Sequence, residues 1–193
     1  MQKMRHLQNS NYTSMPWKNG GGITTEIIVH PAEASMADFD WRMSMADVAQ
    51  DGPFSIFPGI DRTLCILEGA GLSLSIDERQ PVVLAMDSDP LPFPADVPVN
   101  AVLTGGPIVD LNIMSRRGHY AHRVKRHRGA LTVRSAASTM TIIFATEPVT
   151  VSSGGEIMHL QRRDSLLLER GTGFTAQAIE KDGRFFVVTF DQV

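Results

Sequence analysis

The chain has 193 residues and a mass of 21.2 kDa, enough for one large domain or two small ones. Its 18 basic and 21 acidic residues give a formal net charge of −3, which excludes a globally basic nucleic-acid binder and a strongly acidic disordered chain. No apolar run approaches the roughly 20 residues of a membrane span, and no apolar stretch follows the basic residues at the start to suggest a secretory signal. The lone Cys65 admits no internal disulfide and fits a reducing compartment. We therefore expect a cytoplasmic protein.

Short stretches of alternating polarity, separated by Gly, Pro, Asn or Asp, recur along the chain and predict strands. The clearest predicted strands are Gly22–His30, Trp41–Val48, Arg62–Leu67, Leu72–Ile76, Ala101–Leu103, Ile108–Met114, Met140–Ala145, Ser165–Leu168 and Arg184–Phe190. Only Ala32–Met36 suggests a short helix. The segment Glu156–Leu168 has some helical spacing, but a pair of strands fits it better because Arg162 and Arg163 interrupt the apolar pattern.

This pattern predicts an all-β protein. With no crossover helices, the sheets must pack on themselves as antiparallel sandwiches or barrels. Residues 1–117 and residues 118–193 each contain enough strands for one small barrel. No sequence repeat relates the two parts.

The centre of the chain is basic. Between Leu111 and Thr146 there is no acidic residue, and there are seven basic ones: Arg116, Arg117, Arg123, Lys125, Arg126, Arg128 and Arg134. Residues 118–129 fit a solvated edge strand whose Lys and Arg side chains block edge-to-edge pairing. The alternative is an anion or nucleic-acid patch. Only Tyr120 could stack on a base there, which favours the edge strand.

The sequence offers little for metal or nucleophilic chemistry. None of the six histidines forms the His-x-His pair that lets one strand aim two imidazoles at a metal. Cys65 lies in an apolar strand, where a thiol is more often core than nucleophile. The Gly-rich loop Gly20–Gly22 lacks the spacing that cradles a phosphate chain. We expect no metal and no organic cofactor.

Several polar residues occupy strand positions that the pattern predicts to be buried. Arg42 and Ser44 share one strand face, and Asp110 and Asn112 share another. Alternation also places Thr24, Glu26 and Ile28 on a common face. A buried cation must be paired, so Arg42 should meet Glu26, Asp110 or a ligand carboxylate. A structural ion pair and a ligand contact are both open for Arg42.

The segment Asp51–Arg62 contains two Gly, two Pro and two Phe, which describes a constrained loop with apolar anchors. Its polar groups include Ser55, Asp61 and Arg62. The Arg62 guanidinium offers a fork that suits a carboxylate. An Asp61–Arg62 contact that braces the loop is the structural alternative.

Four segments together resemble the HutD/Ves family. They are Met15–Gly22 (MPWKNGGG), Phe39–Ala46 (FDWRMSMA), Asp51–Arg62 (DGPFSIFPGIDR) and Asp110–Gly118 (DLNIMSRRG). The resemblance is strong over residues 15–118, where PGIDR is followed by LEGAG, and rests beyond them on order and length.

The resemblance implies a bicupin, meaning two cupin-like barrels in one chain, and a link to histidine utilisation through sensing of an intermediate. The motif positions of the family fall here on Trp17, Lys18, Asn19, Glu26, Arg42, Ser44, Asp51, Phe54, Ser55, Asp61, Arg62, Asp110 and Asn112.

Our first hypothesis is a metal-free binding protein for a small carboxylate metabolite such as urocanate or N-formylglutamate. Arg42 and Arg62 would clamp the carboxylate in the N-terminal barrel. Ser44, Asn112 and Lys18 would add hydrogen bonds, and Trp17 and Phe54 would wall the site. The sequence leaves the oligomeric state open, a homodimer included.

Two alternatives belong to other classes. The first is a metal-independent isomerase or hydrolase acting on the same substrates, with Glu26, Asp51 or Asp110 as general base. The second is a regulator that contacts nucleic acid through the basic strip Arg116–Arg128, which we rank last because no recognition helix is apparent.

Overall fold

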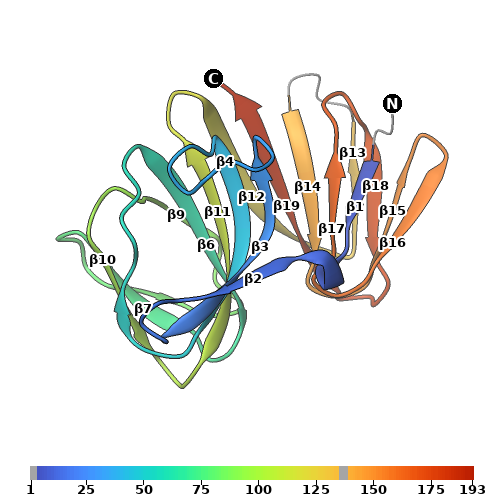
Figure 1. Ribbon diagram of the computed structural model, residues 1–193. Helices are drawn as coiled ribbons and strands as arrows, with labels where there is room; N and C mark the ends of the chain where they lie inside the picture. The colour runs from blue at the N-terminus through green and yellow to red at the C-terminus, as the bar shows by residue number, and fades with distance from the viewer. Residues whose placement is uncertain (1–3, 135–138) are drawn as a thin grey trace. The chain divides into compact units, whose positions relative to one another are not determined.

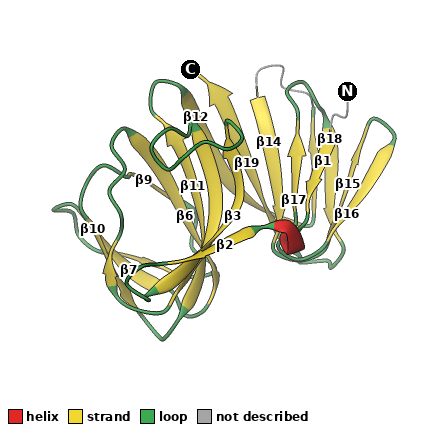
Figure 2. Ribbon diagram, viewed as in Figure 1, coloured by secondary structure: helices red, strands yellow, loops and turns green. Residues whose placement is uncertain are grey.

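The computed structural model describes residues 4–134 and 139–193, which form strands joined by turns and loops (Figures 1 and 2). The 3-10 helix Asn9–Asn11 interrupts this pattern. The strands are β1 (Met4–Leu7), β2 (Thr13–Pro16), β3 (Gly22–His30), β4 (Trp41–Val48), β5 (Gly52–Pro53), β6 (Ile60–Glu68), β7 (Leu72–Ile76), β8 (Val82–Leu84), β9 (Leu91–Pro94), β10 (Val99–Leu103), β11 (Ile108–Arg116), β12 (Tyr120–Arg128), β13 (Ala130–Val133), β14 (Thr139–Ala145), β15 (Val149–Ser153), β16 (Glu156–Leu160), β17 (Ser165–Leu168), β18 (Phe174–Ala178) and β19 (Arg184–Gln192). No helix among the described residues is long and apolar enough to cross a membrane.

The chain divides into two compact units. The central unit comprises Thr13–Ala121, and the terminal unit comprises the described residues up to Tyr12 together with His122–Val193. Each unit contains two sheets. In the central unit their strand orders are β2-β3-β4-β11-β6-β9 and β5-β10-β7-β8, and in the terminal unit β1-β17-β14-β19-β12 and β13-β18-β15-β16.

The two units repeat one pattern of eight strands. Adding eight to each label of β9-β6-β11-β4 gives β17-β14-β19-β12, and the same step converts β5-β10-β7-β8 into β13-β18-β15-β16. Strands β2 and β3 extend the central unit beyond β4, whereas β1 extends the terminal unit beyond β17. The repeat lies in strand order and pairing, which explains why it is invisible as sequence similarity.

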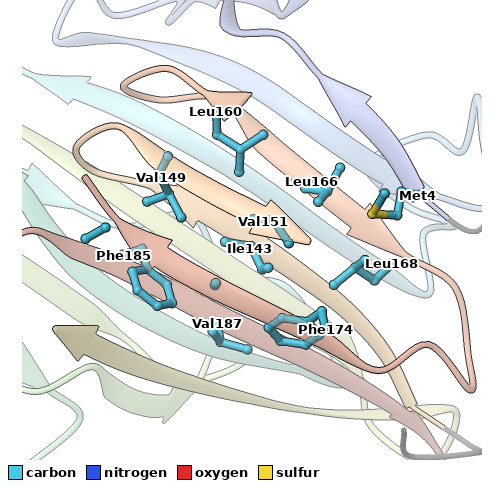
Figure 3. Packing of buried hydrophobic residues seen from close by; sticks show 13 residues of the cluster. Met4, Ile143, Val149, Val151, Leu160, Leu166, Leu168, Phe174, Phe185 and Val187 are labelled. Atoms are coloured by element: carbon cyan, nitrogen blue, oxygen red, sulfur yellow. The ribbon is translucent and has the colours of Figure 1, made fainter. Parts of the chain in front are cut away.

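The terminal unit has an apolar core. Its core draws side chains from both sheets, as Figure 3 shows. The buried members are Met4, Ile143, Ala145, Val149, Val151, Leu160, Leu166, Leu168, Phe174, Ala176, Ala178, Phe185 and Val187. Burial of this apolar surface is the main force that holds the two sheets together.

The central unit also has an apolar core between its two sheets. It joins β4, β6, β9 and β11 of one sheet to β7, β8 and β10 of the other through Ala46, Val48, Leu64, Ile66, Leu72, Leu74, Ile76, Leu84, Phe93, Val99, Ala101 and Ile108. Strand β7 shows the expected alternation, since Leu72, Leu74 and Ile76 are buried and the two serines between them are partly exposed.

All nine predicted strands are present, and four of them have the predicted bounds: β3, β4, β7 and β17. Residues 156–168 form the two strands β16 and β17, as the strand interpretation predicted. Residues 120–128 form β12, an edge strand of the five-stranded sheet. The helix predicted at Ala32–Met36 is wrong, because this segment is a loop that contains turns. One of these turns is closed by a hydrogen bond from Ala34 N–H to the Pro31 carbonyl.

Two further expectations differ from the structure. The predicted division assigned residues 1–117 to one barrel, but β1 pairs with β17 and so belongs to the terminal unit. Ile28 does not share a face with Glu26, because a β-bulge lies between them: Glu26 is opposite Ser44 and Ile28 is opposite Met43. The extra residue reverses the alternation after Glu26.

Candidate functional site

The central unit contains a cavity of about 700 Å³ that is partly open to solvent. Its lining residues come from the β2–β3 turn, from the loop around β5, and from β4, β6 and β11. They are Pro16, Trp17, Lys18, Asn19, Gly21, Thr24, Met36, Arg42, Ser44, Ala46, Val48, Gln50, Asp51, Gly52, Pro53, Phe54, Ser55, Phe57, Arg62, Ala101, Asp110, Asn112 and Met114. This size is ample for a small metabolite.

Strand alternation and register build the polar wall of this cavity. Across β4, β11 and β6 the pairing aligns Arg42 with Met114 and Arg62 in one row. The next row that faces the cavity aligns Ser44 with Asn112, and the row after it aligns Ala46 with Asp110. Every second residue of these strands therefore points inward, and several of these residues are polar.

Arg42 is held by the strand beside it. Arg42 is buried, with 3% of its surface exposed. Its Nε donates a hydrogen bond to Glu26 Oε2 at 2.8 Å. Its Nη1 also lies 3.4 Å from Ser44 Oγ. Of the partners predicted for Arg42, the structure pairs it with Glu26. This ion pair fixes the guanidinium at the cavity wall.

Arg62 is buried without such a partner. The residue is 8% exposed, its Nε is buried with no hydrogen-bond acceptor, and none of the ion pairs formed by the described residues includes it. Its guanidinium lies over the rings of Phe54 and Phe57, with its carbon 4.9 and 5.7 Å from their centroids. Burial lowers the pKa of Arg62 to about 10, an effect that Asp110 opposes and Arg42 reinforces.

Asp110 and Asn112 form the third polar group of the wall. They are 1% and 5% exposed, and Asn112 Nδ2 donates to Asp110 Oδ1 at 2.5 Å. Burial raises the pKa of Asp110 to about 7, against the lowering effects of Arg62 and of the Asn112 hydrogen bond. Asn112 Oδ1 is buried and has no partner.

The β2–β3 turn supplies another side of the cavity. Trp17 Nε1 donates to Thr24 Oγ1 at 2.7 Å, and the side-chain oxygen of Asn19 accepts from Gly21 N–H at 3.0 Å. Gly22 is required for this arrangement, because a Cβ there would come within 2.4 Å of the Asp47 carbonyl and 3.0 Å of the Trp17 ring.

The loop around β5 completes the lining. Asp51 Oδ1 accepts from Leu103 N–H at 2.7 Å, and Phe54 N–H donates to the Val99 carbonyl at 2.8 Å. These bonds tie the loop to β10.

Eleven of the thirteen candidate residues line the cavity: Trp17, Lys18, Asn19, Arg42, Ser44, Asp51, Phe54, Ser55, Arg62, Asp110 and Asn112. Glu26 is not a lining residue and contacts Arg42 instead. Asp61 lies outside the cavity and accepts from Arg117 Nη2 at 2.7 Å, so the structural alternative of an Asp61–Arg62 contact is wrong. Consecutive strand residues point to opposite faces, which separates Asp61 from Arg62.

The structure adds lining residues that the sequence reasoning did not select. Met114 continues the alternation of Asp110 and Asn112, and Phe57 follows Phe54 in the same loop, so both could have been inferred from spacing. Met36 could not, because it lies in the segment predicted as a helix.

The basic residues around β12 are largely engaged in contacts within the chain. Arg123 Nη1 donates to Asp191 at 2.6 Å, and the Arg126 guanidinium carbon lies 5.2 Å from the Phe186 ring centroid. Arg116 donates to two backbone carbonyls, and Arg117 bridges Asp61 and Asp96. These contacts fit the edge-strand interpretation better than a surface kept for phosphates.

No group of three or more His, Cys, Asp or Glu side chains within residues 4–134 and 139–193 could hold a metal ion.

The fold is that of the cupins. The chain is similar to a cupin 2 conserved barrel protein from Leptotrichia buccalis, with a TM-score of 0.59 and coverage of 98% of this chain and 96% of that one. At 10% identity this likeness concerns the fold alone.

The family model named HutD matches residues 9–186, and the chain belongs to the HutD family. It is 30% identical to HutD from Pseudomonas fluorescens SBW25, with a TM-score of 0.85 and coverage of 98% of this chain and 99% of that chain. It is also 34% identical to an uncharacterized 21.2 kDa protein of the hutC 3' region of Pseudomonas putida, over 97% of both chains. Protein Ves of Citrobacter koseri is 38% identical over 56% of both chains.

Proposed function

We propose that the protein binds a small carboxylate metabolite in the cavity of the central unit and acts as a sensor rather than an enzyme. Arg62 carries this proposal: it is a buried guanidinium at a cavity wall, with an unpartnered Nε and no ion pair among the described residues. A charge in such a place is costly to the fold, and a ligand anion would offset that cost.

The neighbouring charges favour an anion. Arg42 is aligned with Arg62 across Met114, and Lys18 also lines the cavity. Glu26 is engaged by Arg42, Asp51 by a backbone N–H, and Asp110 by the Asn112 amide, so three basic groups face two acidic ones among the lining residues. The two guanidinium groups would each contact the carboxylate, and Trp17 and Phe54 would cover the apolar part of the ligand.

Family membership suggests the pathway. HutD and the hutC region, named in two of the relatives, connect this proposal with histidine utilisation. The first ligands to test are urocanate and N-formylglutamate. We further propose that the two units are two cupin-like barrels, since they repeat one strand order, and that the protein acts in the cytoplasm.

Thermal unfolding in the presence of carboxylates tests the binding site. The panel contains urocanate, N-formylglutamate, glutamate, histidine and unrelated carboxylates, with Arg42→Ala as the cavity variant and Arg79→Ala as the matched control. Arg79 is an exposed arginine of the same unit that does not line the cavity. A ligand at about 100 times its Kd stabilises the folded protein by roughly 2.7 kcal/mol, which gives an evident shift in Tm.

We expect one carboxylate to raise the Tm of the wild type and of Arg79→Ala, and to leave the Tm of folded Arg42→Ala unchanged. Equal shifts in all three proteins would place the ligand elsewhere. No shift with any carboxylate would refute the proposal.

A second candidate function is acid–base catalysis by Asp110. Its pKa of about 7 is near the range in which a carboxyl can both accept and donate a proton, and it lines the cavity. Incubation with each ligand followed by NMR would detect turnover or deuterium exchange from solvent. The absence of both signals with a ligand that binds would exclude this candidate.

A further inference from the structure

The cavity wall contains two unpartnered polar atoms of opposite character. Arg62 Nε is a hydrogen-bond donor, and Asn112 Oδ1 is an acceptor. Both atoms are buried, and the two residues that carry them are each more than nine-tenths buried. Both residues line the cavity. Buried polar groups are normally paired, so each atom indicates a group that the ligand supplies.

Asp110 determines which end of the Asn112 amide faces the ligand. The structure turns the NH₂ group of Asn112 toward Asp110 Oδ1 at 2.5 Å. At a pH above the Asp110 pKa of about 7 the carboxylate is ionised and can only accept hydrogen bonds, which holds the amide in this orientation. The amide oxygen is then the free end. Asp110 is in this sense a positioning residue, since it holds Asn112 as an acceptor.

The two atoms belong to neighbouring rows of the wall. Arg62 is aligned with Met114, which lies two residues from Asn112 on β11. Two residues of a strand span about 7 Å. A single small molecule in the cavity can therefore contact Arg62 with one end and Asn112 with a group several ångströms away.

We propose that the ligand carries, in addition to its carboxylate, an N–H or O–H donor that binds Asn112 Oδ1. This inference rests on the proposed carboxylate-binding function and narrows its ligand class. A plain carboxylate would leave the Asn112 oxygen buried and unpaired, whereas a ligand with a donor would satisfy it, and an unpaired buried acceptor costs binding free energy. A dicarboxylate without a donor would bring a second acceptor toward Asn112 and Asp110 and would be disfavoured further.

Two pairs of probes test the inference on the wild-type protein by titration calorimetry at a pH of about 8, where Asp110 is mostly ionised. Urocanate has an imidazole N–H, and trans-3-(2-furyl)acrylate has a similar shape without it. N-formylglutamate has an amide N–H, and glutarate lacks it. We expect at least one donor-bearing probe to bind at least about tenfold more tightly than its partner, because the partner leaves a buried acceptor unpaired.

Two variants assign the preference to the proposed atoms. Asn112→Leu removes the acceptor, and Asp110→Asn removes the carboxylate that fixes the amide, so we expect the ratio of the two affinities to fall toward one in each folded variant. Arg79→Ala is the matched control and should keep the wild-type ratio. The Asp110→Asn substitution hardly changes the volume of the side chain, so we expect this variant to fold. It can therefore be used for the test even if Asn112→Leu does not fold.

The outcomes separate this inference from the proposed function. Equal affinities within both pairs would overturn the donor inference while carboxylate binding stands. A preference that persists in both variants would overturn the assignment to Asn112. No binding by any of the four probes would overturn the donor inference and the carboxylate-binding proposal together.

Discussion

The central and terminal units have the same order of eight strands but differ in what those strands place inside. In the central unit β6 and β11 direct Arg62, Asp110 and Asn112 into a cavity. In the terminal unit the corresponding strands β14 and β19 place apolar side chains in the core, among them Ile143 and Phe185. One pattern of pairing thus supports a polar cavity wall in one unit and an apolar core in the other.

The difference teaches that strand order and interior chemistry are independent. An apolar interior contributes stability directly, whereas a wall with a buried, unpaired arginine reduces it. Buried polar groups with shifted pKa values cluster at functional sites, which is why the cavity of the central unit is the candidate site. The predictions below test this contrast in order of decreasing effect.

The largest effect is expected in the apolar core of the terminal unit. Phe185 is fully buried there, so Phe185→Ala should lower the free energy of unfolding by about 3–5 kcal/mol. Denaturant unfolding measures this change. Ligand affinity of the folded variant should equal that of the wild type, and a loss of stability below about 1 kcal/mol would contradict a close-packed core.

Arg62→Met should have the opposite effect from Phe185→Ala, because it should weaken ligand binding without lowering stability. Replacing a buried, unpaired cation by an apolar side chain of similar length should leave the Tm at least as high as that of the wild type. Ligand binding should weaken by about 1.5–3 kcal/mol, or roughly 10- to 150-fold, because a charge-assisted contact is lost. Thermal unfolding and titration calorimetry measure the two effects, and a variant that is less stable but binds normally would refute the assignment.

Asp110→Asn should change how stability depends on pH. Because burial raises the pKa of Asp110 to about 7, the folded protein keeps this proton between about pH 4 and 7, whereas the unfolded chain has released it. Asp110 therefore makes the free energy of unfolding fall as pH rises through this window. Relative to wild type, the variant should lose this component of the slope, which denaturant unfolding at several pH values would detect; identical profiles would argue against a raised pKa.

The smallest effect concerns Asp61, which lies outside the cavity beside exposed Arg117. Asp61→Asn should leave the affinity for the carboxylate unchanged, since surface ion pairs of this kind have little influence at a distance. Titration of this variant beside Arg62→Met compares two consecutive residues of β6 that point to opposite faces. A tenfold loss of affinity in Asp61→Asn would show that the site extends beyond the cavity wall described above.

Much of the fold could be predicted from sequence because strand alternation is a local signal. The bounds of β4 followed directly from its pattern, and Arg42 and Ser44 were correctly placed on one face. Short strands such as β5 and β13 could not be found, because two to four residues carry too little pattern. The pairing of β1 with β17 depends on residues more than 150 positions apart, which no local signal reveals.

The candidate site was predictable in its residues but not in its contacts. Polar residues at alternate positions of buried strands indicated Arg42, Arg62, Asp110 and Asn112. Which acid would meet which base depended on register and on the bulge after Glu26, and both are tertiary features. Arg42 therefore forms an ion pair with Glu26. Asp61 bonds to Arg117, and not to Arg62 as their adjacency in sequence had suggested.

The most direct test of the account is a crystal structure of the protein with the carboxylate that gives the largest rise in Tm. We predict that the ligand carboxylate lies within about 3.2 Å of nitrogen atoms of both Arg42 and Arg62, inside the cavity of the central unit. A ligand bound in the terminal unit, or one in the cavity that contacts neither guanidinium, would contradict the central claim.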